Sequence, residues 1–280
     1  MAHRNISIFT KIAIYITMLV FTVLTIYPLV WVIIQSFKTN MDYMMNSRLA
    51  LPQEWYFGHY QVIWNQWNFF NFFQNSVIYT SVTVIMVVLL SNMAGFAFAK
   101  IDFKITKWLL GLFIMGLLLT LQSILVPLFL MVNAVGLINT RLGVLIPYIG
   151  LGLPMAVYLN TDFIKNGIPS ELMESAEIDG ASLLKVYRKI ILPMSSPVII
   201  TIAIITFVAT WNEFIIMNIL TTYDGLRSIP TLVGRFAGSL GTNWGVLFTI
   251  LSLSLVPMLV FYFIFRNKIT QGIAAGAIKG

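Results

Sequence analysis

Cysteine is absent from this 280-residue chain, and only two histidines occur, His3 and His59. Without cysteine the chain has no disulfide framework, thiol chemistry or cysteine-based metal site, and neither histidine has the nearby ligands that a metal site needs. There is also no G-x-x-x-x-G-K-[ST] phosphate loop, no H-E-x-x-H motif and no Ser/His/Asp arrangement. We therefore expect no catalytic residues, no metal and no cofactor in this chain.

Charge is also scarce. Only 10% of the residues are charged and 59% are hydrophobic, whereas about a quarter of an ordinary soluble domain is charged. The net charge of +7 does not indicate a nucleic-acid partner, because the basic residues lie between apolar runs rather than along one face. This composition indicates a protein embedded in a lipid bilayer.

Long apolar runs are abundant. A helix needs about 20 apolar residues to cross the hydrocarbon core, and six runs qualify. The first is too long for a signal-peptide core and no small-x-small cleavage site follows it, so we interpret it as a retained helix. The sequence predicts an all-α polytopic membrane protein, a single transmembrane domain over residues 1–280. The expected spans are 12–34, 77–99, 108–132, 142–160, 196–220 and 245–265.

Basic residues are distributed unequally between the two sides of these spans. With the N-terminus inside, twelve of them lie on the inner side and five on the outer side, and an excess of Lys and Arg marks the cytoplasmic side. Both termini and the loop 166–194 are therefore expected in the cytoplasm. The inner residues are Arg4, Lys11, Lys100, Lys104, Lys107, Lys165, Lys185, Arg188, Lys189, Arg266, Lys268 and Lys279; the outer ones are Lys38, Arg48, Arg141, Arg227 and Arg235.

The longest charged passage, 171–193, lies in this loop. Acids dominate its first half and bases its second, with Gly180 between them. Glycine enters the left-handed region without strain, so it can end a helix. Ser170 is placed to cap the first helix and Pro193 to close the second. The pattern predicts helix, turn, helix. Such a loop is either an ordinary solvated connection or, because it is amphipathic, a docking element for a partner.

These residues resemble a known family. Glu174-Ser175-Ala176, three residues, Gly180, nine residues and then Ile190-x-Leu192-Pro193 is similar to the EAA loop of permease subunits of binding-protein-dependent ABC importers, which has alanine at the position of Ser175. The segment 272–280 resembles the end of the maltose/multiple-sugar branch. Trp211-Asn212-Glu213-Phe214 and Asn75-Ser76 resemble that branch too.

The resemblance implies partners and roles. The implied partners are a second, similar permease, a pair of cytoplasmic ATPase subunits that bind the ATP and Mg, and an extracytoplasmic solute-binding protein. The implied location of the whole assembly is the cytoplasmic (inner) membrane of a bacterium or archaeon. By the same resemblance the loop docks on the ATPase, and the C-terminal tail 266–280 reaches it too. The docking residues are Glu174, Ser175, Ala176, Asp179, Gly180, Ile190, Leu192 and Pro193, and the tail residues are Gly272, Gly276, Lys279 and Gly280.

Glu213 is the one acid inside an expected span. A carboxylate there costs free energy unless it is paired or in contact with water. Glu213 is therefore either a residue of the pore or of a subunit contact, or it is a structural hydrogen-bond anchor. Trp211 and Asn212 beside it have the chemistry to stack on and hydrogen-bond to a sugar. Asn75 and Tyr148 complete the candidate substrate pathway.

Two further segments have unusual composition. Prolines and glycines in the fourth span predict a kinked or interrupted helix. The outer segment 37–74 is rich in aromatic residues, which favours an interfacial belt or short helices, with a sugar-stacking platform as the sharper alternative.

The substrate class follows only from the resemblance, which implies monosaccharides or oligosaccharides. Glycerol-phosphate-type polyols are a related possibility. A secondary carrier or facilitator that works alone is the alternative, but carriers of that kind place several ionisable groups in the membrane. A membrane-embedded enzyme is the third and least supported interpretation, since the sequence lacks the catalytic groups that it would need.

Overall fold

The computed structural model describes the backbone of residues 7–101, 103–237 and 243–277 and the side chains as far as Arg266. The secondary structure of these residues is entirely helical. Four helices among them are long and apolar enough to cross a bilayer, and the number rises to six if two bent helix pairs each count as one span. The all-α prediction is confirmed. The four are α1 (Ile8–Gln35), α4 (Phe69–Lys100), α7 (Arg141–Gly167) and α14 (Trp244–Ala277), and each contains one expected span.

Two expected spans are not single helices. The run 108–132 is divided into α5 (Thr106–Leu117) and α6 (Leu121–Ala134), which are bent by 107°. The chain between them contains neither proline nor glycine, so this bend has no sequence signal; Thr120 is extended and its hydroxyl lies 2.6 Å from that of Ser123. The run 196–220 is divided into α11 (Ser196–Trp211) and α12 (Ile215–Leu220).

The chain forms two compact units. One comprises residues 1–69 and 233–257 and contains α1, α2 (Asn40–Met45) and α3 (Gly58–Gln66). In its aromatic-rich segment Phe37 contacts the rings of Trp55, Phe57 and Tyr60 at centroid distances of 5.1–5.5 Å. Short helices, one of the alternatives expected for the outer segment, are therefore present as α2 and α3, and at least part of its aromatic content is internal packing.

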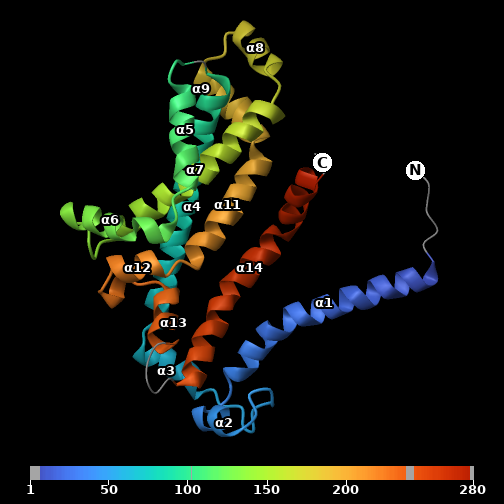
Figure 1. Cartoon of the computed structure of the whole chain (residues 1–280), viewed down its shortest axis with the longest axis vertical. Coiled ribbons are helices and arrows are strands. Elements are labelled where there is room, and N and C mark those ends of the chain that lie inside the picture. Colours follow the sequence, from blue (N-terminus) through green and yellow to red (C-terminus); the bar gives the residue numbers. More distant parts are fainter. Residues whose placement is uncertain (1–6, 102, 238–242, 278–280) are drawn as a thin grey trace. The chain divides into compact units, whose positions relative to one another are not determined.

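The second unit comprises residues 70–232 and 258–280. Within it α7 packs against both α5 and α11, and α8 (Glu171–Ile178) lies beyond the end of these helices (Figure 1). Despite Pro147 and Pro154, α7 is continuous for 27 residues, so of the two expected alternatives the interruption does not occur and the kink stays a prediction. The short elements η2 (Asp224–Leu226) and α13 (Ile229–Ala237) follow α12.

Small residues allow α4 and α7 to approach closely. A Cβ at Gly95 would lie 2.6 Å from Cβ of Asn160, and one at Gly152 would lie 2.9 Å from a methyl of Val87. Asn160 is fully buried; its amide donates to the Ser91 hydroxyl and accepts from the Asn92 amide, both at 2.9 Å. Small residues and interhelical polar bonds are the usual means of packing helices in lipid. Gly95 and Gly152 thus let α4 and α7 pack closely.

Candidate functional site

The segment 166–194, which we call the docking hairpin, begins where α7 ends. Its first helix, α8, starts after Ser170, whose carbonyl accepts from the amides of Met173 and Glu174 at 2.9 and 3.2 Å. The Ser170 side chain makes no capping bond, so the expected side-chain cap is wrong. Its hydroxyl instead accepts from the Lys100 ammonium at 3.0 Å.

Gly180 makes the turn between the two arms. Its φ is +72°, the left-handed conformation that the sequence predicts there. The Gly180 amide donates to the Glu177 carbonyl at 3.0 Å, and the Ala181 amide to the Ala176 carbonyl at 2.9 Å. These two bonds form a Schellman motif, which satisfies the last carbonyls of α8 and fixes the exit direction of the chain.

The second arm contains α9 (Leu183–Val186), a π-helical turn at Tyr187–Ile191 labelled η1, and α10 (Leu192–Met194). Pro193 does not close this arm as expected, because the helix continues to Met194 and then bends by 71° into α11. A proline ring clashes with the carbonyl four residues earlier in a regular helix. The wider turn, in which the Leu192 amide donates to the Tyr187 carbonyl, relieves that clash. π-Turns of this kind are frequent at functional sites.

One face of the docking hairpin is buried. Met173, Val186, Tyr187 and Ile191 are buried in a cluster with residues of α4 and the end of α7, and Ala176, Ile190 and Leu192 pack against its edge. Three of the predicted docking residues are therefore partly internal. The remaining five, Glu174, Ser175, Asp179, Gly180 and Pro193, are exposed.

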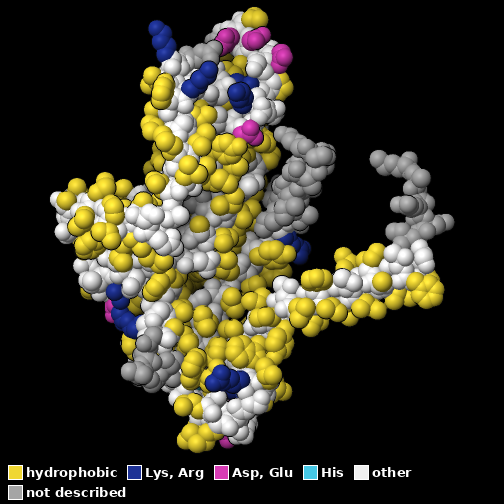
Figure 2. All heavy atoms as spheres, viewed as in Figure 1, with side chains coloured by type: hydrophobic (Ala, Val, Ile, Leu, Met, Phe, Trp, Pro, Cys, Tyr) yellow, Lys and Arg dark blue, Asp and Glu magenta, His cyan; other side chains and the backbone are white. Residues whose placement is uncertain are grey.

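The other face is exposed and mixes acid with apolar side chains. Ile178 is 87% exposed, although it is a large hydrophobic residue, and Leu184 is 56% exposed. Figure 2 shows acidic and basic side chains close together on the surface around α8 and α9. Exposed apolar side chains bordered by charge are typical of a protein interface. Ile178 was not singled out from the sequence; its place at the end of α8, just before the glycine turn, is the signal that could have found it.

Glu213 lies in the short connection between α11 and α12. Its carboxylate accepts three hydrogen bonds, from the amides of Ile216 (2.7 Å) and Met217 (3.2 Å) and from the Tyr148 hydroxyl of α7 (2.7 Å). The first amides of a helix lack intrahelical acceptors, and its N-terminus favours negative charge. The geometry thus matches a structural anchor, and the carboxylate joins α12 to α7.

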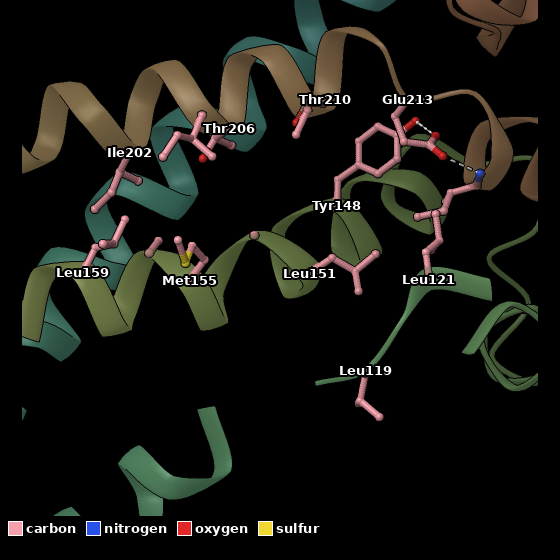
Figure 3. Close-up of a pocket in the computed structure, with 15 residues that line it drawn as sticks. Leu119, Leu121, Tyr148, Leu151, Met155, Leu159, Ile202, Thr206, Thr210 and Glu213 are labelled. Atoms are coloured by element: carbon pink, nitrogen blue, oxygen red, sulfur yellow. Dashed lines mark hydrogen bonds between the residues drawn. The ribbon is translucent and has the colours of Figure 1, made fainter. Parts of the chain in front are cut away.

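A cavity of about 400 Å³ lies beside this anchor. Its walls come from α7, α11 and the bend between α5 and α6 and are mostly aliphatic, with Leu151 and Ile202 among them. Polar groups are few: Thr206, Thr210 and Glu213 follow one another along one wall, with Tyr148 opposite (Figure 3). Among the five predicted pathway residues, Tyr148 and Glu213 line this cavity.

The other three predicted pathway residues lie elsewhere. Trp211 is 4% exposed, and its ring stacks on Phe207 at 5.8 Å. The Asn212 amide donates to the Val208 carbonyl at 2.8 Å. Asn75 is fully buried and donates to the carbonyls of Gly225 and Arg227 at 2.8 and 3.1 Å.

Asn75 belongs to a network that holds the segment 221–228, which we call the outer loop. Arg141 donates to the Asn75 side-chain oxygen at 3.2 Å, and the Ile229 amide donates to the Ser76 hydroxyl at 2.9 Å. The Asn139 side-chain oxygen accepts from the Thr222 amide at 2.6 Å. From the sequence Asn139 was not singled out and Arg141 was named only as an outer basic residue, because an isolated polar residue next to a span carries no distinctive pattern.

The predicted tail residues Gly272, Gly276, Lys279 and Gly280 lie outside the residues whose side chains are described. Within the described residues, no group of three or more His, Cys, Asp or Glu is placed to hold a metal ion.

The fold therefore defines a multi-pass helical membrane protein with a polar docking hairpin and a cavity among its helices. Residues 88–275 match the family described as binding-protein-dependent transport system inner membrane component. The chain belongs to this family, and it is thus a permease component of ABC importers, as its sequence resemblance indicated.

Known proteins are similar to this chain along nearly its whole length. The ORF2 protein of Caldicellulosiruptor sp. (strain Rt8B.4), named as an ABC transporter permease, is 33% identical over 97% of this chain and 98% of its own. The trehalose/maltose transport system permease protein MalG of Thermococcus litoralis is 29% identical over 98% and 99%. A crystal structure of a bacterial ABC transporter that imports the acidic polysaccharide alginate matches 95% of this chain and 98% of that one, with a TM-score of 0.80 and 20% identity.

Proposed function

We propose that this chain forms half of the translocation pathway of an ATP-driven sugar importer and receives its driving force through the docking hairpin. The observation that carries the proposal is the hairpin itself. It has a buried inner face that fixes it to the membrane helices and an exposed face of Ile178, Leu184 and acids. Such a face fits a groove with an apolar floor and basic edges on an ATPase subunit.

The proposed assembly contains this chain, a second similar permease, an ATPase pair and an external solute-binding protein. Both termini and the docking hairpin lie on the cytoplasmic side of a bacterial or archaeal inner membrane, in line with the excess of inner Lys and Arg. With the bent pair α5–α6 counted as one span, and α11 together with the helical arm that bends into it as another, the chain has six crossings in all.

The proposed substrate is a monosaccharide or oligosaccharide. A relative named for trehalose and maltose transport supports this class. The cavity beside Glu213 offers the hydroxyls of Thr206 and Thr210 along one wall, which suit sugar hydroxyl groups in passage, while its aliphatic walls disfavour tight binding of so polar a solute. We therefore assign affinity for the substrate mainly to the external binding protein and the partner permease.

Reconstitution tests this function against that of a stand-alone carrier. The chain is purified alone and as the complete complex, and uptake of radiolabelled sugars, including trehalose and maltose, is measured in proteoliposomes. We expect uptake only with the ATPase pair, internal ATP and the binding protein all present. Uptake by the chain alone, without ATP, would establish a carrier or facilitator instead.

A further inference from the structure

Lys100, the last residue of α4, contacts the start of the docking hairpin. Its ammonium donates to the Ile168 carbonyl at 2.7 Å and to the Ser170 hydroxyl at 3.0 Å. Ile168 is the C-cap of α7, and the next residue, Pro169, has no N–H. A cation suits a helix C-terminus, where carbonyls lack partners and the dipole is negative. Lys100 thus joins α4 to the first arm of the hairpin.

Phe96, one turn earlier on α4, contacts the second arm. It is 6% exposed, and its ring centroid lies 5.6 Å from that of Tyr187 in the π-turn. Gly95, the residue directly before Phe96, lies against Asn160 and Thr161 of α7. The last two turns of α4 therefore contact both arms of the hairpin and the helix that leads into it.

The opposite end of α4 contacts the outer loop. Asn75 donates to two of its carbonyls, and Ser76 accepts from the amide of Ile229 directly after it. The whole of α4 is a continuous helix of 32 residues without proline, and the stretch from Asn75 to Lys100 is about 38 Å long at 1.5 Å per residue. By contrast, α7 contains two prolines and α11 ends at the Glu213 connection.

We infer that Lys100 is a positioning residue that, with Phe96, fixes the docking hairpin to α4, and that α4 carries a displacement of the hairpin to the outer loop. The inference rests on the proposed function, since it requires an ATPase that moves the hairpin. A helix fixed at both ends and free of proline transmits displacement along its axis, because its backbone hydrogen bonds resist stretching. The hairpin and the outer loop then change position together.

A single reporter cysteine tests this link without knowledge of the substrate. The natural chain contains no cysteine, and Tyr223 in the outer loop is 66% exposed, so Tyr223→Cys gives one site for a maleimide dye. The complete importer in proteoliposomes is labelled with and without ATP plus vanadate, and ATP hydrolysis is measured in parallel. We expect the nucleotide to change the labelling rate.

The decisive variants are Lys100→Met, Lys100→Arg and Lys104→Met in the reporter background. Loss of a charge-assisted hydrogen bond corresponds to a factor of about ten in an equilibrium. Lys100→Met should reduce the nucleotide-dependent change in labelling rate about tenfold while the complex still hydrolyses ATP, and Lys100→Arg should restore it. Lys104 is exposed on the same side, so Lys104→Met removes the same charge and should leave the change intact.

An unaltered response in Lys100→Met would overturn the inference, and so would an equal loss in Lys104→Met. If Lys100→Met does not assemble, Ser170→Ala and Phe96→Leu replace it, with an expected reduction of about two- to threefold each; an unaltered response in both would be equally contrary. Failure of the proposed function looks different, because the reporter would then not respond to nucleotide even with Lys100 present.

Discussion

The docking hairpin and the cavity wall at Glu213 both carry carboxylates, but in opposite surroundings. On α8 the side chains of Glu171, Glu174 and Glu177 are exposed to water. Glu213 is surrounded by protein donors, two amides of α12 and the Tyr148 hydroxyl. Exposed acids at the end of a helix are available to a partner, whereas a carboxylate with three internal donors serves the fold itself. We therefore propose the hairpin as the interaction site, whereas the hydrogen bonds of Glu213 hold the wall of the cavity in place.

The largest expected effect concerns Gly180, for which the chain offers a matched control in Gly136. Both have positive φ (+72° and +69°), both occupy the same position of a Schellman motif, and a Cβ on either would meet nothing within 4 Å. Valine at either position costs about 1–2 kcal/mol of backbone strain. We expect Gly180→Val to abolish ATP-driven uptake and Gly136→Val, with the same strain at the end of α6, to retain most of it. Equal loss in both variants would assign the effect to stability rather than coupling.

The next effect concerns Glu213. Glu213→Ala leaves two amides and a hydroxyl without their acceptor and should lower the free energy of unfolding by about 2–4 kcal/mol. Tyr148→Phe removes one of the three donors and should cost about 1–2 kcal/mol. Thermal unfolding in detergent measures both. A variant of Glu213 with unchanged stability but weakened sugar uptake would make this carboxylate a substrate contact instead.

A smaller effect is expected at Glu174, the exposed counterpart. Glu174→Gln removes a charge that makes no contribution to the buried cluster, so the midpoint of thermal unfolding should not change. Because charges at an interface set association rates, affinity for the ATPase pair should fall on the order of threefold. Binding kinetics of the purified ATPase to the permease in nanodiscs provides the measurement. A lowered unfolding midpoint would show that Glu174, like Glu213, stabilises the fold, and would contradict the distinction drawn between them.

The smallest effect extends the comparison to a buried base, His59. Its Nε2 lies 3.0 Å from the Lys38 carbonyl, and burial lowers its pKa below 6.5, more strongly than this hydrogen bond raises it. The neutral ring therefore stabilises the fold above pH 6.5, and this contribution is lost as the pH falls through the lower folded pKa. The unfolding midpoint should decrease from pH 7.5 to 5.5, and His59→Gln should show a weaker decrease. An identical pH profile in the variant would remove His59 from this account.

The sequence predicted best those structural features that one physical constraint determines. Apolar runs are set by the bilayer, so the spans in α1, α4, α7 and α14 followed from length alone. Gly180 was predictable because few residues other than glycine adopt its φ. The bend between Leu117 and Leu121 was not, because the three residues between these helices, Leu118, Leu119 and Thr120, include no helix-breaking type.

The candidate site shows the same limit. Glu213 was recognised from its rarity in a span, but its donors come from Ile216, Met217 and the distant Tyr148, which no local pattern connects. Asn75 was expected in a substrate pathway and instead binds carbonyls 150 residues further along the chain. Polar residues in membrane helices are recognisable in a sequence because they are rare there, whereas their hydrogen-bond partners are visible only in the folded structure.

Cross-linking from the docking hairpin tests the central claim most directly. Because the chain has no cysteine, Glu174→Cys places a single thiol on the exposed face of α8, and a thiol-reactive photo-cross-linker is attached in the complete complex. The account predicts that mass spectrometry finds the cross-link on the ATPase subunit and that the yield changes when ATP is added. A product confined to external proteins, or to no hydrolytic subunit, would contradict it.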